Sequence, residues 1–276
     1  MKYAITLSSF RQLESLEDTL SKISTLGFDS VEMFGEPSEI DIRQTTELLR
    51  SYDMPVCGVT GMWGGISSEG CRRRLLSQDS AILGAAMEYV RDCAKLCNAL
   101  GGWEFNVCLF AEENSSTDRT HRITPESEKE KMRSRIVPIL SELCKYSENL
   151  GVTLVLEPLN RYSTPYCASS KDAARIVGQV DRISLGILLD TFHMNIEEDS
   201  FENALHDAKT YLRHMHFADN NRRMPGFAHI DFAAVARAIK SVGYAGTVSF
   251  EPNISQSSYE RELKSGLELI REKLAD

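Results

Sequence analysis

The segment Thr153-Leu-Val-Leu-Glu157 is a short apolar run that ends on a carboxylate, and three later segments repeat this pattern with another metal-binding side chain at the end. They are Leu185-Gly-Ile-Leu-Leu-Asp190, Arg213-His-Met-His216 and Thr247-Val-Ser-Phe-Glu251. Stretches of helical character separate the four segments. In a barrel of eight parallel strands the carboxyl ends of all strands converge on one face, where active sites are built. The pattern therefore predicts that two glutamates, one aspartate and one histidine meet around a single point.

The rest of the chain alternates short apolar runs with longer amphipathic ones, and the β-branched and aromatic content of the short runs favours strands. The expected strands are Tyr3–Leu7, Ser30–Met33, Val56–Thr60, Gly102–Val107, Thr153–Glu157, Ser184–Leu189, His214–Phe217 and Thr247–Glu251. The expected helices are Leu16–Leu26, Ile42–Ser51, Ala81–Leu100, Glu126–Leu150, Lys171–Val177, Phe201–Asp207, Phe232–Val242 and Ser257–Leu274. Eight alternating pairs predict an α/β fold, a (β/α)₈ TIM barrel. A doubly wound open sheet is the alternative, but no Gly-x-Gly-x-x-Gly follows the first strand.

Composition and charge narrow the class of protein. A length of 276 residues suits one such barrel, and no Pro/Gly/Ser-rich linker divides it, so we expect a single domain over residues 1–276. The net charge of −9 disfavours nucleic acid as a partner. The absence of an apolar run of about 18 residues argues against a membrane span. Seven cysteines, an odd count with no export signal, favour reduced thiols and a cytoplasmic location.

The four strand-end residues predict a metal site. Carboxylates packed that closely repel one another unless a cation lies between them, so we expect one divalent ion held by Glu157, Asp190, His216 and Glu251. An oxygen-rich ligand set favours Mn²⁺, with Mg²⁺ or Co²⁺ as alternatives, over Zn²⁺, which more often takes His and Cys. Taken singly, Asp190 also fits a helix cap. Because side chains alternate along a strand, His214 lies on the same side as His216, and either a deeper layer or structural packing fits it.

Longer motifs surround these four residues. They are Leu189-Asp-Thr-Phe-His-Met-Asn-Ile-Glu-Glu198, Leu156-Glu-Pro-Leu-Asn-Arg-Tyr162, His216-Phe-Ala-Asp-Asn-Asn-Arg222 with Pro225-Gly226, and Gly246-Thr-Val-Ser-Phe-Glu-Pro252. Through them the chain resembles the xylose-isomerase-like barrels that epimerise or isomerise sugars. It is most similar to the ketose 3-epimerases that act on tagatose and psicose. The weaker stretch Ser77-Gln-Asp…Tyr89-Val-Arg extends the resemblance into the first half of the chain.

The resemblance implies a role for each matched residue. The metal ligands would be Glu157, Asp190, His216 and Glu251. Glu157 and Glu251 would also exchange the proton at carbon 3 of a free ketose, while His193 and Arg222 would bind substrate oxygens. The chemistry agrees, because inversion at carbon 3 needs a carboxylate on each face of a planar intermediate and a Lewis acid beside the carbonyl. The partner would be a small-molecule ketose, and relatives suggest a homo-oligomer, a dimer or tetramer.

One position departs from the family pattern. Ser163 stands where the ketose 3-epimerases carry a glutamate that is thought to contact the substrate. A serine is shorter and neutral, so the departure bears on free-sugar specificity rather than on the metal site. Two structural interpretations also stay open: Arg222 fits a loop salt bridge with Asp219, and His193 fits a helix cap.

Other functions remain as alternatives. Aldose–ketose or hydroxypyruvate-type isomerases and inosose-type dehydratases share the same metal and glutamate pair, because they too begin by removing a proton beside a carbonyl. Ser163 is the only feature that favours a non-catalytic sugar-binding relative. The presence of both Glu157 and Glu251 argues against it, because binding alone does not need both. DNA-repair enzymes of the endonuclease IV type need further histidines, and none follows Val59-Thr-Gly61 or Asn106-Val-Cys108.

Overall fold

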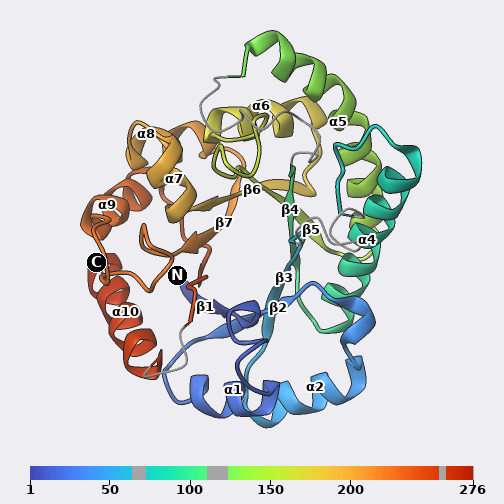
Figure 1. The fold of residues 1–276 in the computed structure, drawn as a ribbon. Helices are drawn as coiled ribbons and strands as arrows, with labels where there is room; N and C mark the ends of the chain where they lie inside the picture. Colours follow the sequence, from blue (N-terminus) through green and yellow to red (C-terminus); the bar gives the residue numbers. More distant parts are fainter. Residues whose placement is uncertain (64–72, 111–123, 255–258, 276) are drawn as a thin grey trace.

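The computed structural model describes residues 1–63, 73–110, 124–254 and 259–275, and its centre is a closed barrel of eight parallel strands in sequential order (Figure 1). The strands are β1 (Lys2–Thr6), β2 (Ser30–Phe34), β3 (Val56–Thr60), β4 (Glu104–Cys108), β5 (Thr153–Glu157), β6 (Leu185–Asp190), β7 (Leu212–Phe217) and β8 (Thr247–Phe250). β8 pairs with β1 and closes the ring. The predicted TIM barrel is confirmed, and each predicted strand overlaps one of these.

Helices surround the barrel on the outside (Figure 1). They are α1 (Leu16–Ile23), α2 (Ile42–Ser51), α4 (Ser80–Ala99), α5 (Glu126–Glu148), α6 (Ser170–Val180), α7 (Thr191–Glu197), α8 (Phe201–Ala208), α9 (Phe232–Val242) and α10 (Tyr259–Leu274), with short 3₁₀ turns η1 (Leu7–Ser9) and η2 (Pro37–Glu39). The prediction missed α7, because its seven residues are too few to show a helical period. Among the described helices, none is long and apolar enough to cross a membrane.

Local capping interactions set where the helices begin and end, and so where the chain enters the next strand. α9, for example, begins after Asp231, whose carboxylate accepts from the amides of Ala233 and Ala234, and ends at Gly243 in the left-handed region with φ 69°. Side-chain caps satisfy the free amides at a helix start, and glycine adopts the left-handed stop without a Cβ clash. The chain then enters β8 in a fixed register, with His216 of β7 opposite Ser249.

Long connections follow β3, β4 and β7 on the carboxyl-end face of the barrel. The third, residues 218–230, is fully described, and its Asp219 carboxylate accepts from the backbone amides of Gly226, Ala228 and Ile230. Much of the other two, residues 61–78 and 109–125, lies outside the described residues. The third connection carries Arg222 to the strand ends.

Candidate metal centre

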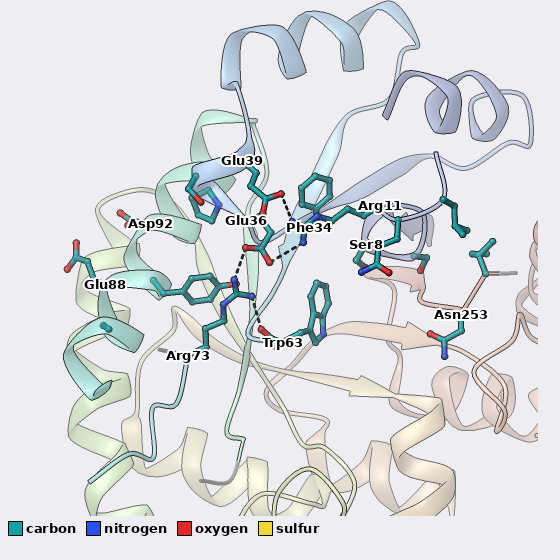
Figure 2. A pocket seen from close by; sticks show the side chains of 18 residues that line it. Ser8, Arg11, Phe34, Glu36, Glu39, Trp63, Arg73, Glu88, Asp92 and Asn253 are labelled. Atoms are coloured by element: carbon teal, nitrogen blue, oxygen red, sulfur yellow. Dashed lines mark hydrogen bonds and ion pairs between the residues drawn. The ribbon is translucent and has the colours of Figure 1, made fainter. Parts of the chain in front are cut away.

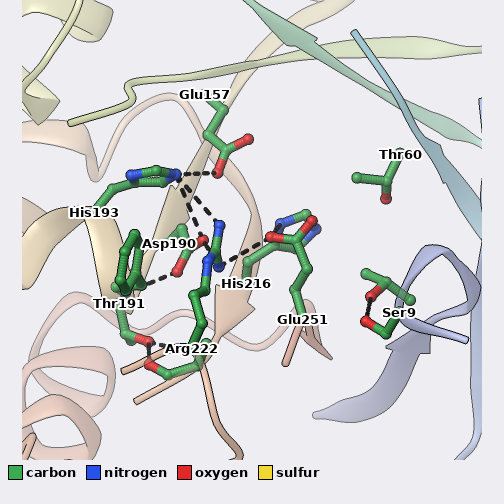
Figure 3. Close-up of polar contacts among 12 residues, drawn as sticks. Ser9, Thr60, Glu157, Asp190, Thr191, His193, His216, Arg222 and Glu251 are labelled. Atoms are coloured by element: carbon green, nitrogen blue, oxygen red, sulfur yellow. Dashed lines mark hydrogen bonds and ion pairs between the residues drawn. The ribbon is translucent and has the colours of Figure 1, made fainter. Parts of the chain in front are cut away.

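The four predicted ligands lie together at the carboxyl ends of neighbouring strands. Asp190 ends β6 opposite His216 of β7, Glu157 ends β5, and Glu251 follows the last residue of β8. One ligand atom from each of the four lies within 4.8 Å of those of the others, and Figure 3 shows the side chains converging. We call these four residues the metal cluster. Three of them, Glu157, Asp190 and His216, are buried, and Glu251 is nearly so.

Asp190 has two functions at once. Its Oδ1 accepts from the backbone amide of Phe192 at 2.8 Å and so caps α7, as the capping interpretation predicted. Its Oδ2 faces the cluster and pairs with Arg222. The helix therefore fixes the carboxylate while leaving one oxygen available inside the cluster.

His216 is oriented by a residue that the sequence analysis did not single out. Its Nε2 lies 2.9 Å from Glu32 Oε2 of β2, and this leaves Nδ1 toward the cluster, 3.4 Å from Glu251 Oε2. His216 Nδ1 has no hydrogen-bond partner although it is buried. A carboxylate behind a metal-binding histidine is the usual device for fixing its ring. The sequence did contain a signal for this role, because Glu32 is a charged residue inside the apolar run Val31-Glu32-Met33.

Glu157 is held on one side and unpartnered on the other. Asn106 donates to Oε2 at 2.7 Å, and the thiol of Cys108 lies 3.4 Å from the same oxygen. The other oxygen, Oε1, is buried without a hydrogen-bond partner. Burial and the nearby negative charges of Glu251 and Asp190 raise the pKa of Glu157 to about 7. The charge of His216 offsets only part of this rise. Such a group calls for a cation or a proton.

Glu251 lies across the cluster from Glu157 (Figure 3) and is paired with Arg222 at 3.0 Å. Burial by itself would raise the pKa of Glu251, but the charges of Arg222 and His216 outweigh it and hold that pKa at about 2. Arg222 adopts the left-handed region with φ 59°, which is uncommon for a side-chain-bearing residue and clusters at functional sites. Its guanidinium is aimed at the carboxylates by that backbone and stacks 4.5 Å from the Phe192 ring.

His193, from α7, turns one nitrogen toward the same point. The backbone amide of Asn160 donates to Nδ1 at 3.1 Å, so Nδ1 is the acceptor and Nε2 carries the proton. Burial lowers the pKa of His193 to about 4, so the ring is neutral near pH 7. Nε2 lies 3.8 Å from Glu157 Oε1 and 3.9 Å from Asp190 Oδ2. His193 and Arg222 therefore present N–H donors on one side of the metal cluster.

A second group of ionisable side chains lies one layer deeper in the barrel. Its members, which we call the inner cluster, are Glu32, Glu104 and His214. His214 Nε2 lies 2.9 Å from Glu32 Oε1, and Nδ1 lies 2.8 Å from Glu104 Oε2. The register places Gly58 between the two glutamates, and a Cβ there would lie 2.8 Å from the carbonyl oxygen of Glu104. The prediction of a deeper layer for His214 therefore holds.

The metal cluster fits a divalent cation by two observations. Glu157 Oε1 and His216 Nδ1 are buried, lack hydrogen-bond partners and belong to residues that converge. When His216 is neutral, as a metal-bound imidazole is, three carboxylates face one guanidinium, which leaves two negative charges that a divalent ion would neutralise. Glu157, Asp190, His216 and Glu251 would hold the ion, with carboxylates and one imidazole as ligands.

The structure also separates the competing interpretations of single residues. Arg222 pairs with Asp190 and Glu251 rather than in the predicted alternative bridge to Asp219. The neighbouring Arg223 pairs with Glu262 at 2.7 Å instead. Ser163 lies in the turn after β5, where its amide donates to the carbonyl of Asn160 at 2.9 Å.

Comparison with known proteins assigns the chain to a family. The profile of the family described as xylose isomerase-like TIM barrel matches residues 20–273. The chain belongs to this family. Over 84% of its length it is 32% identical to a D-psicose 3-epimerase of Ruminiclostridium cellulolyticum, of which it covers 76%. It is also 29% identical to the 3-dehydro-D-guloside 4-epimerase of Escherichia coli (strain K12), covering 94% of this chain and 95% of that protein.

Solved structures agree with this assignment. A D-psicose 3-epimerase with D-tagatose from Clostridium cellulolyticum superposes with a TM-score of 0.83, covers 99% of each chain and is 26% identical. The chain thus has the fold of sugar epimerases and isomerases, and its relatives are named epimerases. The prediction of an enzyme of this class is confirmed.

Proposed function

We propose that this protein is a divalent-metal-dependent ketose 3-epimerase, with Mn²⁺ as the favoured ion. One observation carries the proposal: Glu157 and Glu251 lie on different sides of a point that Asp190 and His216 also face. Two carboxylates so placed match the requirement for inversion at a carbon beside a carbonyl without redox chemistry. The relatives named D-psicose 3-epimerase support the same reaction class.

Each residue has a defined part in the proposed reaction. The divalent ion, when bound, would supply Lewis-acid polarisation of the substrate carbonyl. One glutamate removes the proton from carbon 3, the electron pair of that C–H bond forms the double bond between carbons 2 and 3, and the π electrons of the carbonyl move onto its oxygen to give the enediolate. The other glutamate delivers a proton to the opposite face of carbon 3, and configuration inverts. His193 and Arg222 donate to the developing negative charge, which preorganised donors stabilise strongly.

Solvent deuterium exchange tests this proposal. The enzyme is incubated in D₂O with Mn²⁺ and unphosphorylated ketoses, and the products are analysed by NMR. We expect deuterium at carbon 3 together with the carbon-3 epimer, loss of activity with EDTA, and recovery with Mn²⁺, Co²⁺ or Mg²⁺. Aldose formation would instead indicate an isomerase, and loss of water a dehydratase. Exchange on no ketose, or full activity in a metal-free preparation, would reject the proposal. A cytoplasmic location and a homo-oligomeric state stay predictions.

A further inference from the structure

A large cavity opens on the carboxyl-end face of the barrel, over its first three strands. It has a volume of about 940 Å³ and is lined by residues that follow β1, β2, β3 and β8, together with one face of α4 (Figure 2). Cavities of ~300–1,000 Å³ hold drug-sized ligands, and a single monosaccharide is smaller than such a ligand. The space is therefore larger than a free ketose needs.

This cavity adjoins the metal centre. Asn253, which lines it, follows Glu251 by two residues and donates its backbone amide to the carbonyl of Arg222 at 2.5 Å. Ser9 also lines the cavity, and its hydroxyl lies 3.0 Å from that of Thr6. Figure 3 shows Ser9 on the far side of Glu251 from Glu157. A substrate whose reacting carbon lies at the metal cluster would extend over these residues into the cavity.

The walls of the cavity are held in place by their own contacts. Arg73 is buried, donates to the Trp63 carbonyl at 2.7 Å and to Glu36 at 2.6 Å, and stacks 4.4 Å from the Tyr89 ring. Glu36 also binds Arg11 at 3.2 Å. The row Arg73–Glu36–Arg11 runs along one wall (Figure 2). Planar charged groups fixed in this way present directed donors and acceptors at little further entropic cost.

The described lining residues include four carboxylates and two arginines, and neighbouring basic side chains on α4 balance the remaining charges. These carboxylates each have a basic partner: Glu36 pairs with Arg11 and Arg73, Glu39 with Arg11, Glu88 with Arg91, and Asp92 with Lys95. A phosphate would face several carboxylates, and an ammonium group would compete with bound arginines. A neutral group rich in hydroxyls needs neither, because it can donate to the carboxylates and accept from the guanidinium groups.

Aromatic side chains complete the lining. Trp63 and Phe34 are partly exposed in the cavity, and Figure 2 shows Trp63 between the Arg73 and Asn253 sides. Aromatic faces bind the apolar C–H face of a sugar ring, while its hydroxyls point to polar neighbours. An aromatic face beside paired planar charges is thus suited to a pyranose.

We infer that the substrate is a glycosylated ketose, with its keto-sugar at the metal cluster and a second, neutral sugar in the cavity against Trp63. The inference rests on the proposed function for the first half of the substrate and revises the expected free ketose.

Matched substrates test it. Deuterium exchange at the fructosyl carbon 3 is measured with D-fructose, with 6-O-glucosyl-fructose, with 4-O-glucosyl-fructose and with D-fructose 6-phosphate. We expect at least one glucosyl-fructose to exceed fructose about tenfold or more in kcat/KM, and the phosphate to show no such gain. Equal or lower kcat/KM for both disaccharides would overturn the inference while leaving the epimerase proposal intact.

The two tryptophans of the chain provide a matched pair of variants. Trp63→Ala changes the cavity, whereas Trp103→Ala makes the same change just before β4, at the opposite end of the barrel. We expect Trp63→Ala to lower the disaccharide-to-fructose ratio of kcat/KM about tenfold and Trp103→Ala to leave that ratio unchanged. An equal effect of both variants would contradict the assignment of the cavity. Circular dichroism checks that both variants are folded.

A binding measurement separates the two proposals. Trp103→Ala leaves Trp63 as the only tryptophan, so its fluorescence in the presence of Mg²⁺ reports on the cavity. A saturable change with glucosyl-fructose, and none with fructose at the same concentration, supports the inference even if no ketose exchanges deuterium. If no disaccharide binds or exchanges, the inference fails, whatever happens with fructose.

Discussion

Glu32 connects the inner cluster to the metal cluster, because its carboxylate contacts both His214 and His216. The two clusters nevertheless differ in how their charges are paired. In the inner cluster both nitrogens of His214 lie within 2.9 Å of carboxylate oxygens. In the metal cluster the contacts are longer: His216 Nδ1 lies 3.4 Å from Glu251 Oε2, Glu157 Oε1 lies 3.8 Å from His193 Nε2, and three carboxylates face one guanidinium. Burying ionisable groups is costly unless they are paired. The paired charges of the inner cluster stabilise the barrel, whereas the surplus negative charge of the metal cluster favours a bound cation.

The largest expected effect comes from the glutamates of the metal cluster. Glu157→Gln or Glu251→Gln removes one of the two groups proposed to move the carbon-3 proton, so deuterium exchange at saturating Mn²⁺ should fall at least ~10³-fold. The matched change in the inner cluster, Glu104→Gln, should stay within about tenfold of wild type. Activity within tenfold of wild type in either metal-cluster variant would reject the two-base mechanism.

The inner cluster should give the protein a pH-dependent stability. Burial lowers the pKa of His214, but Glu32 and Glu104 outweigh it and raise that pKa to about 9. The charged imidazole thus stabilises the fold fully below its unfolded pKa of about 6.5, and this contribution is lost as the pH rises through 9. We expect a loss of about 3 kcal/mol in the free energy of unfolding of EDTA-treated protein.

Glu104→Gln is the control for that measurement. It removes one of the two carboxylates that raise the pKa of His214. Urea denaturation between pH 6 and pH 9.5 should therefore show a smaller drop for the variant than for wild type. An unchanged drop would show that His214 is not the group that titrates.

Glu32 links the two clusters, and its removal should be felt in both. Glu32→Gln leaves His216 without its charged partner, so Mn²⁺ affinity measured by calorimetry should fall ~10–100-fold. Glu104→Gln touches only His214 and should change Mn²⁺ affinity less than about threefold. Equal losses in the two variants would mean that the clusters act as one unit.

The smallest expected effect concerns the rim above the metal cluster. Ser163→Glu adds a carboxylate in the turn that carries Asn160, whose amide holds His193. We expect relative kcat/KM among free ketoses to shift by roughly twofold to tenfold, the size of a modest change in polar contacts. An unchanged ranking on every ketose would mean that position 163 does not contact the substrate.

The convergence of Glu157, Asp190, His216 and Glu251 was predictable because each ends an apolar run, and strand ends in a barrel converge whatever the helices between them contain. Helix α7 was missed because it is short, although the motif that contains it was recognised. Glu32 and Asn106 were missed for another reason. Each lies inside a strand, far in the chain from the residue that it supports: Asn106 reaches Glu157 through the pairing of β4 with β5, and Glu32 reaches His216 across the closed barrel.

The amino-acid sequence determined the barrel and the side chains at its carboxyl-end face. It could do so because the periodicity of apolar residues and the residue type at each strand end are local properties of the sequence. Tertiary packing alone decided which oxygen and which nitrogen of those side chains remain without partners. It also decided that a wide, charge-balanced cavity lies beside them. Both depend on distances between strands and loops that are remote in sequence, and such distances are fixed only when the barrel closes.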